Sequence, residues 1–315
     1  MRVVDLIANI LKREGVEYLN CYPSTPLIEA SAKLGIRPII CRQERVGVGI
    51  ADGYARVTNG RSPSVFAMQH GPGAENAFPG ISTAYSDSSP VLFMPMGHPL
   101  HRDRVFPLFS SVRTYESVTK MAEQINTPDR ALDTMRRAFS ALRNGRPGPV
   151  LIEIPQDIAV QEVDDALLND YTPVRAVRSQ ADPADVETAC QALLDAKHPI
   201  IFAGSGVLYS EGWDELAQLA KLISVPVMTT MEGKSAISEK RHPLALGIGS
   251  NVMTGPAHYF LKDADLVFAV GTSLTNHGLM TPIPKGMTII HATNDTRDLN
   301  KSYTADHPIL GDAKL

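Results

Sequence analysis

Cysteine is scarce in this sequence, and the few cysteines present form no metal-binding or redox pattern. Three occur among the 315 residues, Cys21, Cys41 and Cys190, and they lie far apart without a CxxC or CxH spacing. A disulfide framework needs a larger and regularly spaced set of cysteines, and a structural zinc site needs ligands paired at short spacing. The sequence therefore argues against both, and it favours a reducing compartment.

An excess of basic charge is also missing. Lysine and arginine together number 30 against 34 aspartates and glutamates, so the net charge is −4, and no basic tract or stripe occurs. Proteins that bind nucleic acid need such a surface to meet the phosphate backbone. Nucleic acid is therefore not expected as the main partner.

Long apolar runs are absent as well. No stretch approaches the roughly 18 apolar residues of a membrane span. The first 16 residues have an apolar helical face, but Asp5, Lys12 and Arg13 interrupt it. A signal peptide would need an unbroken apolar core and a cleavage site of small residues. We predict a surface helix at this end, and a soluble, cytoplasmic protein that does not bind a membrane.

What the sequence does contain is an ordinary globular composition with two alternating patterns. Hydrophobic residues make up 43% and charged residues 20% of a chain long enough for two domains. In the first half, short apolar runs typical of buried strands alternate with helical patterns. The strands are expected at 18–22, 37–42, 62–69, 90–97 and 149–155, and the helices at 26–34, 44–58, 71–87 and 127–143.

The alternation starts again in the second half, after a polar stretch without a sustained period. Helices are expected at 182–196, 213–223 and 256–264, and a final strand at 288–293. Such alternation predicts an α/β fold with two doubly wound domains and mainly parallel sheets. The predicted boundaries are a first domain at 1–160, a linker at 161–182 and a second domain at 183–315.

Several segments stand in the order and spacing of a known family. The first half contains RQERVGVGIADGYARVTNG, QHGPGAENAFPGISTAYSDSSPVLFMPMG and GRPGPVLIEIPQD. Together they resemble the pyrimidine-binding domain of thiamine-diphosphate enzymes of the acetolactate synthase and pyruvate decarboxylase type. The second half resembles the central domain of the same family through IIFAGSGV, LAQLAKLISVPVMTTMEGKSAI, HPLALGIG, DADLVFAVGT and ILGDAKL. The resemblance spans essentially the whole chain.

The resemblance gives a specific role to Glu44. It implies that this carboxyl hydrogen-bonds N1′ of the coenzyme's aminopyrimidine ring and so activates C2 of the thiazolium. The alternative is a glutamate at a helix N-terminus, where the helix dipole favours negative charge. The motif around Glu44 favours the coenzyme role.

The resemblance also implies coenzyme-binding residues in two loops. In the GPGAEN turn, Gly71 and Gly73 permit close approach to the coenzyme, and Asn76 helps to hold the loop, although the glycines alone also suit a simple turn. In the other loop, Pro23 and Thr25 border the site, but Ser24 stands where glycine is usual. A phosphate at the N-terminus of the helix after GPG is rejected, because the family binds the diphosphate in a third domain.

Candidate residues for handling substrate or protons are Gln69 and His70. Some relatives carry a proton-handling histidine at the position of Gln69, whereas here the histidine comes one residue later. His70 suits general acid–base work near neutral pH, but neighbouring strand residues point to opposite sides. His98, His101 and Arg102 are expected in a solvated loop, with a substrate-anion contact by Arg102 as the alternative.

The second half raises the question of a nucleotide. Several relatives bind FAD there and others do not, so FAD is a further candidate cofactor. Gly204 and Gly206 follow a strand, but a single GxG is a weak sign, and 221–226 offers no acidic partner for the ribose of NAD. An NAD-binding oxidoreductase is therefore the last alternative, after a non-catalytic module of the same fold.

The family's third domain has no counterpart here. Its GDG motif and its later Asn-Asn, which hold Mg²⁺ on the diphosphate, do not occur in these 315 residues. We expect a fragment or a split subunit that acts on a small 2-oxo acid, by carboligation or decarboxylation. A homodimer, a tetramer or a complementary chain with the diphosphate-binding domain is expected to complete the thiamine diphosphate and Mg²⁺ site. No metal ligand is predicted in this chain.

Overall fold

The computed structural model describes residues 1–23, 25–250, 252–276, 278 and 283–315. The chain divides into two compact units, Met1–Val177 and Arg178–Leu315. The division falls inside the segment 161–182 that the sequence suggests as a linker. The two units are described separately below.

The first unit is built on six parallel strands in the order β2-β1-β3-β4-β6-β5. Their bounds are β1 Tyr18–Cys21, β2 Arg37–Ile40, β3 Ser64–Met68, β4 Val91–Gly97, β5 Met121–Gln124 and β6 Val150–Pro155. Every residue of β3, β4 and β6 is buried. Strands covered on both faces read as continuous apolar runs, which is why the sequence identified these three.

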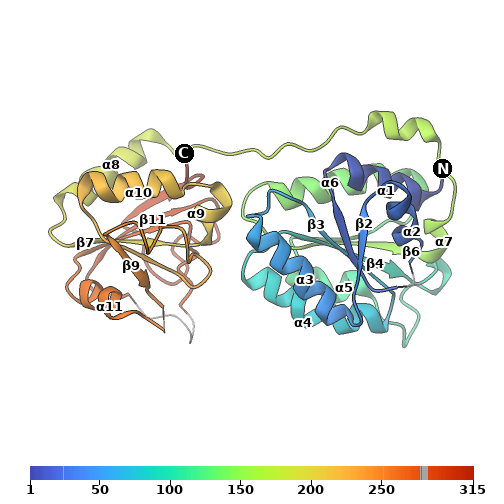
Figure 1. Cartoon of the computed structure of the whole chain (residues 1–315), viewed down its shortest axis with the longest axis horizontal. Helices are drawn as coiled ribbons and strands as arrows, with labels where there is room; N and C mark the ends of the chain where they lie inside the picture. The colour runs from blue at the N-terminus through green and yellow to red at the C-terminus, as the bar shows by residue number, and fades with distance from the viewer. Residues whose placement is uncertain (24, 251, 277, 279–282) are drawn as a thin grey trace. The chain divides into compact units, whose positions relative to one another are not determined.

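Helices cover both faces of this sheet (Figure 1). One face carries α1 Val3–Arg13, α2 Pro26–Lys33 and α6 Ala131–Arg143, and their apolar residues join one buried core. The other face carries α3 Glu44–Val57, α4 Pro72–Ser86 and the short α5 Ser111–Tyr115, which share a second core. A four-residue helix, α7 Gln156–Ala159, follows β6, and short 3₁₀ turns lie at 100–102, 116–118, 128–130 and 165–170.

The strand order places the direction change of the first sheet between β1 and β3. The chain runs from β1 outward to β2, then crosses to β3 on the other side of β1 and continues through β4. In open parallel sheets, ligands bind outside the carboxyl ends of the strands at such a switch point. The candidate residues Thr25, Glu44 and Gln69 all follow strand carboxyl ends near this point.

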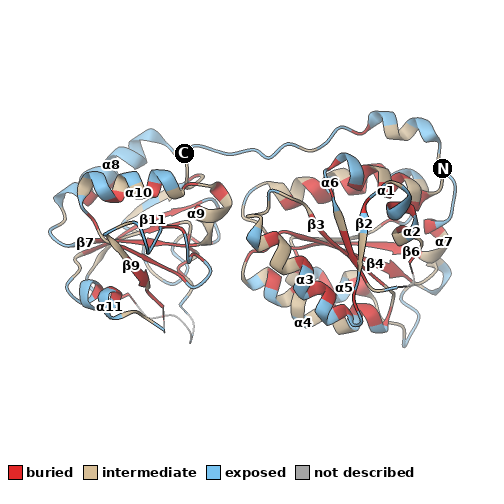
Figure 2. Cartoon of the chain, viewed as in Figure 1, coloured by how far each residue is buried: buried red, intermediate tan, exposed pale blue. Residues whose placement is uncertain are grey.

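The second unit repeats the architecture with the order β12-β11-β10-β7-β8-β9, again all parallel. Its strands are β7 Pro199–Ala203, β8 Val227–Thr229, β9 Ala245–Ile248, β10 Leu266–Val270, β11 Thr288–Thr293 and β12 His307–Leu310. Helices α8 Pro183–Asp195, α9 Ser205–Ser210 and α10 Trp213–Ile223 pack on one face, and α11 Gly255–Lys262 packs on the other. Figure 2 shows the buried strands between the exposed outer faces of the helices.

The predicted α/β class with two doubly wound, parallel sheets is confirmed, and two strand predictions need correction. The segment 288–293 is not the last strand, since β12 follows it, and β5 lies in what reads as a polar connection. Both are edge strands in which no residue is fully buried. Edge strands of this kind give no apolar run, and Pro308 is tolerated in β12 for the same reason. Within the described ranges, no helix has the length and apolar character that a membrane crossing requires.

Candidate active site

Glu44 is the first residue of α3 and lies just past the carboxyl end of β2. Only 4% of the Glu44 residue is exposed to solvent. Its Oε2 accepts a hydrogen bond of 2.9 Å from Asn76 Nδ2, so the structure brings these two predicted residues together. Its Oε1 is shielded from solvent and has no hydrogen-bond partner among the residues described. A glutamate that served only the helix dipole would gain nothing from such burial, whereas an orphaned carboxyl oxygen suits a ligand.

The glycines of the GPGAEN turn leave room around this carboxyl. Gly73 packs so closely that a Cβ placed on it would lie 2.9 Å from Glu44 Oε1 and 2.5 Å from Gln69 Cγ. Gly71 directly precedes α4 and has a φ of +55°, a backbone conformation that residues other than glycine rarely adopt. The close packing at Gly73 and the positive φ at Gly71 therefore favour glycine, and Gly73 lies against both Gln69 and Glu44.

A buried tyrosine that the sequence did not single out supports the start of α4. The Tyr115 hydroxyl donates a hydrogen bond to the backbone carbonyl of Ala74, next to Gly73. Tyr115 is fully buried and its ring lies 5.3 Å from that of Phe78. Burial raises the pKa of its hydroxyl well above the ordinary value, so the group stays a donor. Nothing in the local sequence around Tyr115 marks this role, because the contact joins two distant segments.

His70 contacts two residues that follow neighbouring strands. Gln156, directly after β6, places its Nε2 2.9 Å from His70 Nδ1. His98, directly after β4, places its ring edge-on to that of His70, with centroids 4.8 Å apart and planes at 70°. Burial, followed by the charges of His70 and Arg102, lowers the pKa of His98, so its ring is neutral near pH 7. The sequence suggested His98 only as a residue of a solvated loop and gave no sign of Gln156.

The remaining predicted coenzyme residues lie at the carboxyl end of β1. Thr25 is buried and caps α2, its Oγ1 accepting from the backbone nitrogen of Leu27 at 3.2 Å, while Pro23 is exposed. Ser24 lies outside the described residues. Thr25 therefore has a structural role in the cap, and the coenzyme contacts of Pro23 and Thr25 stay predictions.

The loop after β4 carries the other candidates. His101 and Arg102 are exposed in a 3₁₀ turn at 100–102, which agrees with the expected solvated loop. Among the described residues, no group of three or more histidine, cysteine, aspartate or glutamate side chains has an arrangement that could hold a metal ion.

In the second unit, the GxG turn has a packing explanation. A Cβ on Gly204 would lie 2.3 Å from the carbonyl oxygen of Gly271, and one on Gly206 would lie 2.6 Å from Gly271 Cα. The two turns are also joined by a 2.8 Å hydrogen bond from the Gly206 nitrogen to the Gly271 carbonyl. Backbone fills the space in front of these glycines, and the helix that follows has six residues. The close packing of the two turns therefore accounts for glycine at both positions.

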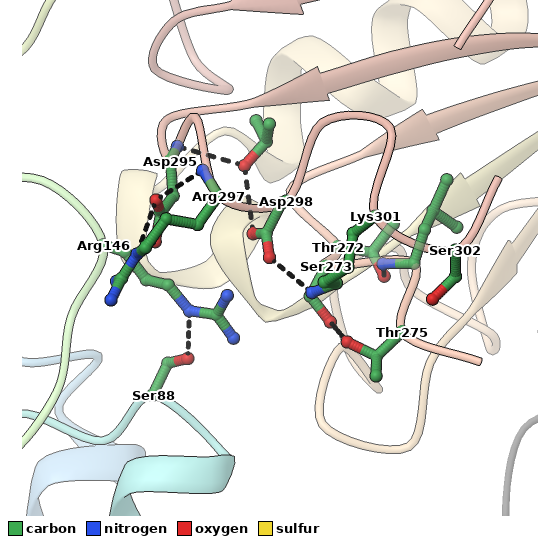
Figure 3. Close-up of polar contacts among 12 residues, drawn as sticks. Ser88, Arg146, Thr272, Ser273, Thr275, Asp295, Arg297, Asp298, Lys301 and Ser302 are labelled. Carbon is green, nitrogen blue, oxygen red and sulfur yellow. Dashed lines mark hydrogen bonds and ion pairs between the residues drawn. The ribbon is translucent and has the colours of Figure 1, made fainter. Parts of the chain in front are cut away.

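The acidic residues after β11 are held within their own loop (Figure 3). Asp295 is paired with Arg297 at 2.7 Å, and Asp298 is paired with Lys301 at 2.7 Å. Both aspartates are buried, and Asp298 also accepts from Thr293 Oγ1 at 3.3 Å. These contacts explain the two carboxylates without a ligand, so FAD binding in this unit stays a prediction of the resemblance.

Comparison with known proteins divides the chain in the same way. Residues 1–124 match the model described as "Thiamine pyrophosphate enzyme, N-terminal TPP binding domain", and residues 186–315 match "Thiamine pyrophosphate enzyme, central domain". Thiamine pyrophosphate is another name for thiamine diphosphate.

Similar proteins in other organisms carry related names. A probable acetolactate synthase large subunit of Methanocaldococcus jannaschii is 32% identical over 100% of this chain and 54% of its own length. A glyoxylate carboligase of Escherichia coli is 29% identical over 100% of this chain and 54% of its own, and an acetolactate synthase isozyme 3 large subunit of Escherichia coli is 28% identical over 98% and 55%. The chain spans about half the length of the curated relatives it matches.

Proposed function

We propose that this chain, which belongs to the thiamine pyrophosphate enzyme family, contributes the aminopyrimidine half of an active site that joins or cleaves carbon–carbon bonds next to the carbonyl of a 2-oxo acid. The observation that carries the proposal is the state of Glu44. One of its oxygens is held by Asn76 and the other is buried without a partner among the described residues.

The residues around Glu44 fit an aminopyrimidine ring. The orphaned Oε1 matches a ring nitrogen that shares or donates a proton, and the Asn76 hydrogen bond fixes the direction of the carboxyl. Gly73 lets the loop approach the carboxyl closely, and Tyr115 holds the turn in place. When bound, thiamine diphosphate supplies a carbon nucleophile that the protein's own side chains lack.

Within this chemistry, carboligation is the preferred reaction and decarboxylation is the alternative. The similar proteins are named acetolactate synthases and a glyoxylate carboligase, which supports an enzyme that joins two small oxo acids through a new carbon–carbon bond. Gln69 contacts the Gly73 side of the site and His70 lies on the same edge, so both are assigned to substrate and proton handling.

The diphosphate and Mg²⁺ are assigned to sequence outside these residues. The GDG and Asn-Asn motifs are absent here, and the relatives are about twice as long as the matched region. The completing region belongs either to the same polypeptide or to a complementary chain, and a homodimer or tetramer brings two such halves together. A cytoplasmic location accords with the reduced cysteines expected of the chain.

The test uses the natural assembly purified from cells that produce it. Pyruvate and glyoxylate are supplied with and without thiamine diphosphate and Mg²⁺, and the products are identified by NMR. The proposal predicts coenzyme-dependent consumption of a 2-oxo acid with a carbon–carbon-joined product, whereas an aldehyde with carbon dioxide would select decarboxylation. Turnover that does not need thiamine diphosphate, or no coenzyme binding, would contradict the proposal.

A further inference from the structure

A second orphaned polar atom lies at the same edge of the first sheet. The Nε2 atom of His98 is shielded from solvent and, like Glu44 Oε1, has no hydrogen-bond partner among the described residues. Both atoms lie near one short turn, since a Cβ on Gly71 would lie 4.0 Å from His98 Nε2 and one on Gly73 would lie 2.9 Å from Glu44 Oε1. A buried ring nitrogen without a partner costs free energy, so its persistence calls for a ligand.

Gln156 selects one tautomer of the neighbouring His70 ring. An amide nitrogen donates hydrogen bonds, so His70 Nδ1, 2.9 Å from Gln156 Nε2, is the acceptor. The neutral His70 ring therefore carries its proton on Nε2 and presents that nitrogen as a donor. This arrangement spans three neighbouring strands, because His70 follows β3, His98 follows β4 and Gln156 follows β6.

Gly71 of the GPG turn lies next to His98. A Cβ placed on Gly71 would have His98 Nε2, at 4.0 Å, as its nearest non-neighbouring atom. The titratable groups that influence the pKa of His98 are His70, Arg102 and Asp103, of which only Asp103 raises it. His98 therefore acts as a neutral hydrogen-bonding group whose buried Nε2 lies next to the GPG turn.

We propose that His98 and His70 form a substrate-oxygen site, in which an oxygen of the 2-oxo acid is the missing partner of His98 Nε2 and His70 Nε2 is the second donor. The inference rests on the proposed function, because it assigns the substrate to the part of the GPG turn next to His98. Gln156 is a positioning residue that holds the donor tautomer of His70.

The first experiment measures kcat/KM in the natural assembly for His98→Leu and for His98→Gln. Leucine removes the donor, so kcat/KM for pyruvate is expected to fall about tenfold to a hundredfold. Glutamine keeps an N–H donor and is expected to retain most of the wild-type value. His258→Leu, on α11 of the second unit, is the matched control and is expected to leave kcat/KM unchanged.

The same variants tested with acetaldehyde, which has a carbonyl but no carboxylate, show which oxygen of the 2-oxo acid His98 binds. If His98→Leu reduces the use of pyruvate and acetaldehyde equally, the bound oxygen belongs to the carbonyl. If only pyruvate is affected, it belongs to the carboxylate. A His98→Leu enzyme within twofold of the wild type on both substrates would overturn the inference.

The second experiment separates this inference from the coenzyme chemistry. Proton exchange at C2 of bound thiamine diphosphate is expected to be unchanged in His98→Leu, and it reports on the proposed function independently. In the ¹⁵N-histidine-labelled chain alone, long-range ¹H–¹⁵N spectra are expected to show neutral His70 protonated at Nε2, with a mixture of tautomers in Gln156→Leu. A proton found on Nδ1 of His70 in the wild-type chain would contradict the assigned donor.

Discussion

Both units have a six-stranded parallel sheet, and in both a glycine turn lies at the point where the strand order reverses. In the first unit, Gly71 and Gly73 follow β3, and in the second unit, Gly204 and Gly206 follow β7. The first pair faces side chains with orphaned polar atoms, Glu44 and His98, whereas the second pair faces the backbone of Gly271. In the same fold, the same residue type thus lies beside orphaned polar side-chain atoms in one unit and against closely packed backbone in the other.

Two buried acids, Glu153 in the first unit and Asp298 in the second, also differ in their partners. In the first unit, Glu153 on β6 is 5% exposed and its carboxyl accepts from Gln124 at 2.6 Å, an uncharged partner. In the second unit, the buried Asp298 is paired with Lys301. Burial without a countercharge raises the pKa of Glu153, and this is the state in which a carboxyl can hold a proton. Glu153 therefore differs from Asp298 in having no countercharge beside it.

The largest expected effect on stability comes from replacing the glycines of the two turns. Gly204→Ala would force a Cβ to within 2.3 Å of a backbone oxygen that cannot move independently, so a loss of about 3 kcal/mol or more in unfolding free energy is expected. Gly73→Ala meets the Gln69 and Glu44 side chains, which can shift, so its loss is expected near 1 kcal/mol. Denaturant unfolding of the two variants measures the difference.

Activity should show the opposite order for these two variants. Gly73→Ala displaces Glu44 or Gln69, so C2-proton exchange is expected to fall at least about tenfold. Gly204→Ala, at a temperature where it stays folded, should exchange at the wild-type rate. Equal losses of exchange in both variants would show that the two glycine turns do not differ in function.

The next effect concerns the buried acids and depends on pH. Between the usual value of about 4.5 and the raised native pKa of Glu153, the native state holds a proton that the unfolded chain has lost, so wild-type stability falls as pH rises. Glu153→Gln removes this fall and should gain of the order of 1 kcal/mol over wild type by pH 7. Urea unfolding between pH 4 and pH 8 measures the trend.

Asp298→Asn is the matched change in the second unit. Removing one partner leaves Lys301 without this buried carboxylate, so stability at pH 7 is expected to decrease by about 1–3 kcal/mol.

A Glu153→Gln variant that is less stable than wild type at every pH would show that Glu153 is charged and paired in the native state.

The smallest expected effect concerns Asn76. Asn76→Ala removes the donor to Glu44 Oε2, so C2-proton exchange should fall about tenfold while unfolding free energy changes by about 1 kcal/mol. Asn9→Ala removes an amide donor to the Asp5 carbonyl on α1 and serves as the control for a lost side-chain amide. Exchange at the wild-type rate in Asn76→Ala would mean that Glu44 needs no orienting partner.

The sequence predicted those strands and helices that a single local pattern identifies. Buried strands such as β3, β4 and β6 are continuous apolar runs, and helices such as α10 show a clear periodicity, whereas the edge strands β5 and β12 have neither. For the site, the resemblance pointed to Glu44 and Asn76, which the structure joins at 2.9 Å. It did not reveal the contacts of Tyr115, His98 and Gln156, because these contacts join segments far apart in the chain.

The central claim is that Glu44 activates a bound coenzyme. The most direct measurement is the rate of C2-proton exchange of thiamine diphosphate bound to the natural assembly, compared between wild type and Glu44→Gln by quenched-flow NMR. Glutamine keeps the size of the side chain but cannot share a proton with a ring nitrogen, so a loss of at least about a hundredfold is predicted. Wild-type exchange in Glu44→Gln, with the coenzyme still bound, would contradict the role assigned to this carboxyl.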